Sequence, residues 1–128
     1  MPRVLIAEDS PTMRALLVSA LEELGPELEV CEAESGFAAL RALSRERFDL
    51  ILTDVNMPDI NGLELLAFSR QSPLQRGVPV LVVSSEGSER DLARARALGA
   101  EAYLVKPIQA EALCRSVRAL LDRSGKES

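Results

Sequence analysis

Histidine is absent from the 128 residues of this chain. The absence excludes Ser-His-Asp and Cys-His catalysis, a histidine-ligated zinc and a histidine general base within the chain itself. If the function involves histidine chemistry, a partner protein must therefore supply the histidine.

Aromatic residues and basic charge are also scarce. The chain has no tryptophan, one tyrosine and three phenylalanines, which is too few for a platform that stacks single-stranded bases. Its 20 acidic and 15 basic residues give a net charge of −5. Nonspecific binding to nucleic acid needs a basic surface that replaces counterions, so we expect no direct nucleic acid binding.

Long apolar runs and closely spaced cysteines are missing as well. No run approaches the roughly 20 apolar residues that span a membrane, and the N-terminus does not resemble a signal peptide, so we expect no membrane insertion. The two cysteines, Cys31 and Cys114, lie far apart in apolar segments, which indicates free thiols in a reducing cytoplasm. Length and a 47% apolar content predict one domain, residues 1–123, followed by a short polar tail, residues 124–128.

Short apolar runs alternate with segments of helical spacing along the whole chain. Ser10 and Pro11 are typical of a helix start, and Asn61 with Glu64 resembles a capping box. The runs predict strands at 4–7, 28–33, 48–53, 78–83 and 102–105, and helices that begin near residues 11, 36, 61, 88 and 109, the last ending near 122.

This alternation predicts an α/β fold of the flavodoxin-like type. It is a doubly wound, five-stranded parallel sheet with five helices on both faces. Charges alternate through 28–33, which suits an edge strand, so the expected strand order is 2-1-3-4-5. The switch point of that order lies between the first and third strands, where Glu8 and Asp9 should face Asp54.

Three acids that converge at strand ends indicate a cation site. Any one of Glu8, Asp9 and Asp54 could simply cap a helix or be solvated. Together they would repel one another by roughly 1 kcal/mol or more for each close pair, and a cation removes that penalty. Because the donors are hard oxygens, the pattern favours Mg²⁺ (or Mn²⁺) over zinc.

The two remaining strands end in groups that suit a phosphoryl group. Ser84 offers a hydroxyl donor and Lys106 a positive charge. Taken singly, each is an ordinary polar residue. A nucleophilic carboxylate, a cation site, a hydroxyl and an ammonium around one point meet the needs of phosphoryl transfer, in which Asp54 accepts the group as an acyl phosphate.

These residues resemble the receiver domain of two-component response regulators. The resemblance is carried by Glu8-Asp9, the stretch from Asp54 to Gly62, Ser84 and Lys106-Pro107, and it covers nearly the whole chain. Within this family, the chain looks most like the single-domain, chemotaxis-type regulators. The family often has Asp-Asp where this chain has Glu8-Asp9, and Thr where it has Ser84, but neither change removes a required chemical group.

The resemblance implies a role for each matching residue. Asp54 would take a phosphoryl group from a phosphohistidine on a sensor histidine kinase or phosphotransfer protein. Lys106 would pair with the phosphoryl oxygens, and Ser84 would donate to the phosphoryl group. Tyr103 would rotate inward when Ser84 moves. The chain would then be a phosphoacceptor switch and not an enzyme that turns over another substrate.

The same resemblance implies the metal ligands and two positions that tune the phosphoryl lifetime. Glu8, Asp9 and Asp54 would hold Mg²⁺ by their side chains, and Asn56 by its backbone carbonyl. Asn56 and Glu86 would flank the path of the hydrolytic water. Small polar side chains at these two positions let water approach the phosphoryl group, so we expect self-dephosphorylation in minutes or less and not in hours.

The output surface implied by the resemblance is the fourth helix, fifth strand and fifth helix. Phosphorylation would shift the population toward a conformer that a downstream protein prefers, with the chain a monomer or weak dimer. Candidate contact residues on this surface are Arg90, Arg94, Tyr103, Cys114 and Arg118.

Three other interpretations stay open at this point. The chain could be an interaction module of the same fold that works without phosphorylation, although the complete set of acids, Ser84 and Lys106 argues against it. It could be a receiver cut from a larger regulator or hybrid kinase. A metal-dependent phosphatase of the aspartyl-phosphate type is disfavoured, because Asn56 stands where such enzymes generally carry an acid/base Asp.

Overall fold

The chain forms a three-layer α/β structure around one parallel sheet. A computed structural model describes residues 1–85 and 88–127, with side chains as far as residue 123. The strand order is β2-β1-β3-β4-β5 and every pair is parallel, so the predicted topology is confirmed. The strands are β1 (Arg3–Ala7), β2 (Glu29–Ala33), β3 (Leu50–Asp54), β4 (Val80–Ser84) and β5 (Ala102–Val105).

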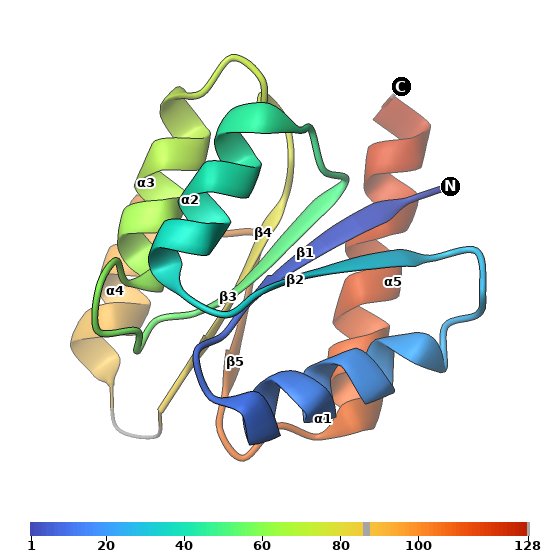
Figure 1. Cartoon of the computed structure of the whole chain (residues 1–128), viewed down its shortest axis with the longest axis horizontal. Coiled ribbons are helices and arrows are strands. Elements are labelled where there is room, and N and C mark those ends of the chain that lie inside the picture. Colours follow the sequence, from blue (N-terminus) through green and yellow to red (C-terminus); the bar gives the residue numbers. More distant parts are fainter. Residues whose placement is uncertain (86–87, 128) are drawn as a thin grey trace.

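Helices cover both faces of the sheet, as predicted. Figure 1 shows α1 and α5 on one side and α2, α3 and α4 on the other. This split is what right-handed crossovers give when the chain reverses direction across the sheet at β1. The helices are α1 (Pro11–Glu22), α2 (Gly36–Arg45), α3 (Gly62–Gln71), α4 (Glu89–Ala97) and α5 (Ala110–Glu127).

The central strands β3 and β4 are buried on both faces, which explains the apolar runs with which they begin, residues 50–52 and 80–83. Successive side chains point to opposite faces, so Leu52 and Leu81 pack under α1 and α5, whereas Ile51 and Val82 pack under α2 and α3. Each such side chain stabilises the fold by roughly 1.5–3 kcal/mol through its burial. The core therefore fixes the register that brings the strand ends together.

Local sequence signals explain where two helices begin. Ser10 accepts a hydrogen bond from the Met13 amide at 3.2 Å, as an N-cap should. Asn61 and Glu64 form a complete capping box, with each side chain bonded to the other's backbone amide. Both predicted helix starts are confirmed. The first cap directly follows Glu8 and Asp9, whereas the second is separated from Asp54 by a short loop.

The C-terminal end differs from the prediction. Helix α5 was expected to end near Asp122, but it continues to Glu127, so most of the predicted polar tail, residues 124–128, is helical. Once a helix is nucleated, each further residue adds one backbone hydrogen bond, and a polar sequence does not prevent this. Across the described residues, no helix has both the length and the apolar content that crossing a membrane requires.

Candidate functional site

Three acidic side chains meet at the carboxyl ends of β1 and β3. The strands pair in parallel with Ala7 opposite Thr53, so the next residues, Glu8 and Asp54, emerge side by side. One carboxylate oxygen from each of Glu8, Asp9 and Asp54 lies within 4.8 Å of the others. The convergence expected from the strand order is therefore present.

Within this acidic cluster (Glu8, Asp9 and Asp54), the Glu8 carboxyl group is buried and only partly hydrogen-bonded. It is only 1% exposed. Its Oε2 accepts from the Ser10 amide at 3.0 Å, whereas Oε1 is buried and finds no hydrogen-bond partner among the described residues. Burial, and next the neighbouring Asp54 carboxylate, raise the pKa of Glu8 from 4.5 to about 8. The folded protein thus disfavours a charge on Glu8 unless a cation is nearby.

The residues present fit a hard divalent cation. A buried carboxylate oxygen that has no partner within the described part of the chain, beside two further carboxylates, is a group that a cation would satisfy. Oxygen-only donors suit Mg²⁺, which keeps several waters and shares its coordination with phosphate. Glu8, Asp9 and Asp54 would hold it, and it would supply charge neutralisation for the phosphoryl oxygens.

Arg14 holds the backbone of this cluster from the first helix. Its Nη1 donates to the Glu8 carbonyl oxygen at 2.9 Å, and its Nε pairs with the Glu32 carboxylate on β2 at 3.2 Å. The guanidinium therefore links the end of β1 to the neighbouring edge strand. We did not identify Arg14 from the sequence, because an arginine on a helix gives no signal of the loop it reaches.

Asp54 lies at the centre of the site with both carboxylate oxygens engaged. The side chain is 1% exposed. Its Oδ2 accepts from Lys106 Nζ at 2.7 Å, and its Oδ1 accepts from the Asn56 amide at 2.9 Å. Residues from the ends of β3 and β5 thus meet at one carboxylate, although they are 52 positions apart.

Gly62 leaves room for the backbone around Asp54. A Cβ atom at this position would lie 2.3 Å from the Asp54 carbonyl oxygen, which is closer than real Cβ contacts. The Gly62 amide donates to the Val55 carbonyl at 3.1 Å and closes the β3–α3 loop onto the strand end. Only glycine allows α3 to begin this close to the acid.

Ser84 and Tyr103 are in direct contact. Ser84 is the last residue of β4 and fully buried, and its hydroxyl forms a hydrogen bond with the Tyr103 hydroxyl. The ring of Tyr103 packs against the core cluster beneath α2 and α3. The structure therefore already turns Tyr103 toward Ser84, and its rotation on movement of Ser84 stays a prediction.

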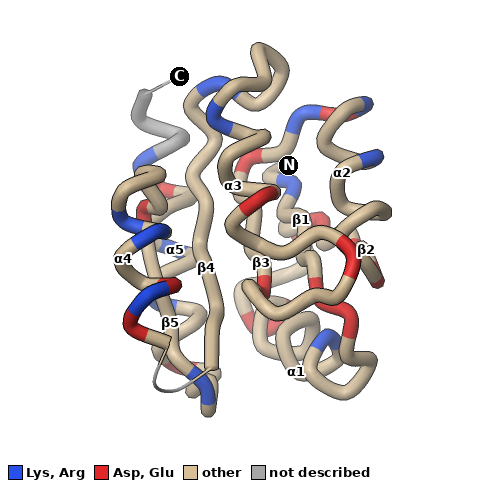
Figure 2. The backbone as a smooth tube through the Cα atoms, turned by 90° about the vertical axis from the view of Figure 1, so that its left-hand side faces the viewer, with Lys and Arg blue, Asp and Glu red and all other residues tan. Residues whose placement is uncertain are grey.

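The expected output residues do not all reach one surface. Arg90 and Arg94 are exposed on α4, and Arg118 is exposed on α5. Figure 2 shows basic and acidic segments alternating along α4, beside β5 and α5. The expectation that Cys114 lies on the output surface is corrected by the structure. Its thiol donates to the Ala20 carbonyl at 3.0 Å, so the side chain is turned toward α1.

Two contacts in the loops were not expected from the sequence. Asp59 accepts hydrogen bonds from the Gly36 and Phe37 amides at 3.1 and 2.9 Å, so it caps α2 from the β3–α3 loop. Asn56 Nδ2 donates to the Ser85 hydroxyl at 2.9 Å. Glu86, the other expected lifetime position, lies outside the described residues.

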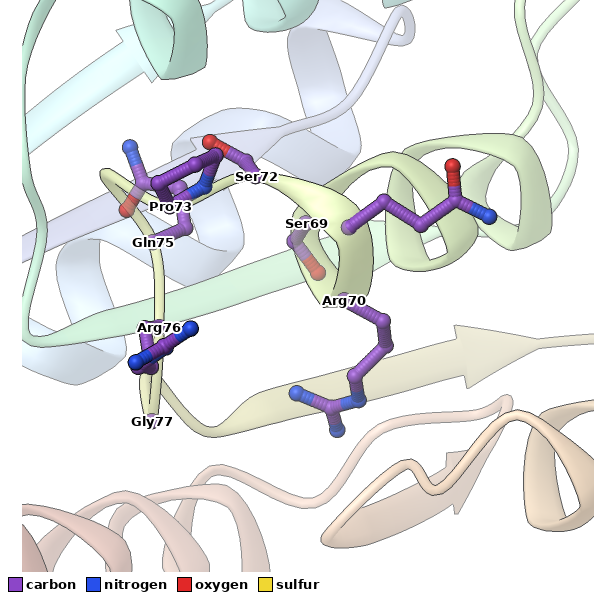
Figure 3. Close-up of a pocket in the computed structure, with 8 residues that line it drawn as sticks. Ser69, Arg70, Ser72, Pro73, Gln75, Arg76 and Gly77 are labelled. Atoms are coloured by element: carbon purple, nitrogen blue, oxygen red, sulfur yellow. The ribbon is translucent and has the colours of Figure 1, made fainter.

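A polar hollow of about 130 Å³ lies at the opposite end of the domain, formed by the end of α3 and the α3–β4 loop (Figure 3). Two of the side chains that line it, Gln75 and Arg70, are paired with neighbouring groups. The Gln75 amide donates to the Leu43 and Glu46 carbonyls, and the Arg70 guanidinium donates to carbonyls and to Glu101. These contacts fasten the loop to its neighbours, so the hollow is structural.

Comparison with known proteins agrees with this geometry. The family profile described as the response regulator receiver domain matches residues 4–118. The chain belongs to this family. It is therefore a receiver domain of two-component signalling, of the kind found in chemotaxis proteins, and the family resemblance inferred from its motifs is confirmed.

Individual relatives cover almost all of the receiver domain. The chain is 33% identical to the chemotaxis protein CheY of Pseudomonas aeruginosa over 94% of this chain and 97% of that protein. It is 36% identical to a protein of Picosynechococcus named as a probable transcriptional regulatory protein, over 94% of this chain and 49% of that protein. A CheY-like receiver domain structure from Methanospirillum hungatei superposes with a TM-score of 0.90 at 29% identity, covering 100% and 99% of the two chains.

Proposed function

We propose that this receiver domain is a phosphorylation-activated switch whose phosphoacceptor is Asp54. The observation that carries the proposal is the environment of the Asp54 carboxylate. It is buried, paired with Lys106 at 2.7 Å, and grouped with Glu8 and Asp9 in a cluster that suits Mg²⁺ or Mn²⁺. The donor is a phosphohistidine on a sensor histidine kinase or phosphotransfer protein, which accounts for a chain without histidine.

The chemical step is a direct transfer. An Asp54 carboxylate oxygen forms a bond to phosphorus while the P–N bond of the donor phosphohistidine breaks. The bonding electron pair leaves with the imidazole nitrogen, which returns to neutral histidine by taking up a proton. Lys106 then pairs with a phosphoryl oxygen, and the Ser84 hydroxyl turns from Tyr103 to the phosphoryl group. The side chains of Glu8, Asp9 and Asp54, with the Asn56 carbonyl, would hold the cation, which would neutralise charge on the phosphoryl oxygens.

The response is a shift of population at the edge of the sheet. When Ser84 donates to the phosphoryl group, its hydrogen bond with Tyr103 is exchanged, and the conformer of β5 and the β4–α4 loop changes with it. A downstream protein reads this change on α4, β5 and α5, where Arg90, Arg94 and Arg118 are exposed. The protein catalyses only its own phosphorylation and dephosphorylation, and its two free thiols favour the cytoplasm.

Relatives support two settings for this switch. The P. aeruginosa relative, which is as short as this chain, is named for chemotaxis. This supports a role for the switch in chemotaxis. We keep the expectation that it acts on a protein target as a monomer or weak dimer. The chain spans about half of the Picosynechococcus relative, which supports the same switch working as one part of a larger regulator.

Intact-mass measurement tests the phosphoacceptor directly. Purified protein is incubated with a small phosphodonor such as phosphoramidate and Mg²⁺, with and without a chelator. The wild type should gain about 80 Da, the mass of one HPO₃ group, only when Mg²⁺ is present. Asp54→Ala should gain nothing, and Asp122→Ala, which changes an exposed aspartate, should match the wild type. A wild type that gains no mass, while it binds a partner protein, would support the phosphorylation-independent module instead.

A further inference from the structure

The hydrogen bond between Asn56 and Ser85 joins the two loops that border Asp54. Asn56 stands two residues after Asp54 at the start of the β3–α3 loop, and Ser85 directly follows Ser84 at the start of the β4–α4 loop. Asn56 Nδ2 donates to Ser85 Oγ at 2.9 Å, and both residues are exposed. The bond therefore joins residues 29 positions apart in the sequence, at the edge of the Asp54 site.

The bond continues the pairing of β3 and β4 beyond the sheet. The last backbone contact between these strand ends is the Val55 amide on the Val83 carbonyl, at 2.9 Å. Past that point the two chains separate toward α3 and α4. Within residues 1–85 and 88–127, the Asn56–Ser85 bond is the one hydrogen bond that joins the separated loops.

Asn56 is held at both ends. Its backbone amide donates to Asp54 Oδ1 at 2.9 Å, and its side-chain amide is fixed on Ser85. The side chain therefore extends from the β3 side of the site to the β4 side. Asp54 is 1% exposed although it ends a strand, and its carboxylate is in contact with the Asn56 amide and Lys106 Nζ.

We propose that the Asn56–Ser85 hydrogen bond is a latch across the entrance to Asp54, and that Ser85 is the positioning residue that keeps it closed. This inference rests on the proposed function. The latch holds the Asn56 amide in one place and so limits the directions from which water reaches the phosphoryl group. It makes the phosphorylated state last longer than an unlatched Asn56 would allow.

The affected step is hydrolysis of the acyl phosphate. A water oxygen forms a bond to phosphorus while the bond from phosphorus to the Asp54 oxygen breaks. The electron pair returns to the Asp54 carboxylate, and inorganic phosphate and a proton are released. The water must approach in line with the bond that breaks, on the side away from Asp54, where a fixed Asn56 amide restricts its approach.

Dephosphorylation rates of Ser85 variants test the latch. The wild type and variants are phosphorylated with phosphoramidate, freed of donor, and followed by loss of the added mass at constant Mg²⁺. Ser85→Ala removes the hydroxyl that accepts from Asn56 and should speed dephosphorylation by about two- to tenfold, the range that one exposed hydrogen bond supports. Ser85→Thr keeps a hydroxyl and should restore most of the wild-type rate.

Two further variants separate the latch from a general loosening of the loop. Ser88→Ala is the matched control, because Ser88 lies in the same loop and its side chain makes no cap hydrogen bond. It should leave the rate unchanged. In an Asn56→Ala background, Ser85→Ala should have little further effect, since the latch is already gone.

The outcomes divide cleanly. A faster Ser85→Ala rate that disappears in the Asn56→Ala background supports the latch. An unchanged or slower rate, a Ser85→Thr rate equal to that of Ser85→Ala, or equal effects of Ser85→Ala in both backgrounds would overturn it. Failure of the wild type to become phosphorylated at all would count against the proposed function itself, and so the two failures are distinguishable.

Discussion

Proton release on Mg²⁺ binding is the prediction that follows most directly from the acidic cluster. Glu8 is 1% exposed, with Oε1 buried and unpartnered among the described residues, and its pKa is raised from 4.5 to about 8. At pH 7 the metal-free protein therefore carries a mostly protonated Glu8. A cation bound by this carboxylate must displace that proton.

The sign and size of the effect follow from linkage. Because the folded-state pKa of Glu8 lies above its unfolded value of 4.5, the stability that this group contributes is greatest below pH 4.5. It is lost as the pH rises toward about 8 in the metal-free protein. At about 1.4 kcal/mol per pH unit, the change amounts to a few kcal/mol. The apparent Kd for Mg²⁺ should fall by up to about tenfold for each pH unit gained below pH 8.

Calorimetry at several pH values measures both quantities. Titration with Mg²⁺ in buffers of different ionisation enthalpy should show close to one proton released at pH 6–7 and almost none above about pH 9. Urea unfolding without metal should give a Glu8→Gln variant that is more stable than the wild type at pH 8 but not at pH 4.5. Glu34→Gln, which changes an exposed glutamate, is the control.

The result that would refute this reasoning is a flat profile. If the Mg²⁺ Kd does not change between pH 6 and 8 and no proton is released, Glu8 is already ionised in the metal-free protein. If Glu8→Gln binds Mg²⁺ with the wild-type affinity, Glu8 is not a ligand, whatever its protonation state.

Two further predictions concern the loop between β3 and α3. Gly62→Ala places a Cβ atom 2.3 Å from the Asp54 carbonyl oxygen, so it should lower the free energy of unfolding by about 1–3 kcal/mol and slow phosphorylation. Gly25→Ala, which meets no atom within 4 Å but has a positive φ, should lower stability without slowing phosphorylation. Asp59→Asn should lower the thermal midpoint, because hydrogen bonds from the α2 amides, chiefly Phe37, depress the pKa of Asp59. The stability that the Asp59 carboxylate contributes is present above pH 3.8, its usual pKa, and is lost as the pH falls through the depressed pKa. The difference in thermal midpoint between Asp59→Asn and the wild type should therefore disappear in acid. A gap that persists unchanged at low pH would show that the charge on Asp59 does not contribute to the cap.

Periodicity was sufficient to predict the sheet and the residues at its carboxyl edge. Residues 50–52 and 80–83 are apolar because both faces of β3 and β4 are covered, and the alternation of charged and apolar residues in β2 marks an edge strand. Once the order is known, the first polar residue after each strand must lie at one edge. Glu8, Asp54 and Ser84 were found in this way.

Contacts that depend on how loops and helices lie against each other could not be predicted in this way. The spacing of α5 gives Cys114 a position on the helix, but it does not say that α1 crosses there, so the thiol was wrongly assigned to the output face. Arg14 and Ser85 look like ordinary surface residues until their partners, the Glu8 carbonyl and the Asn56 amide, are placed. No local pattern encodes either contact.

In the β3–α3 loop, residues 55–61, strand positions that the sequence predicts meet loop contacts that it does not. Its Asn56 is bonded to the β4–α4 loop and its Asp59 to the start of α2, so the segment after Asp54, the proposed phosphoacceptor, is held on both sides. The strands set which groups surround Asp54, and these are the groups that the transfer requires. The loop contacts leave that set unchanged and alter only access and stiffness. On the proposals above, a substitution at Ser85 changes the lifetime of the phosphorylated state and one at Asp59 changes the stability of the loop, whereas the groups around Asp54 stay the same.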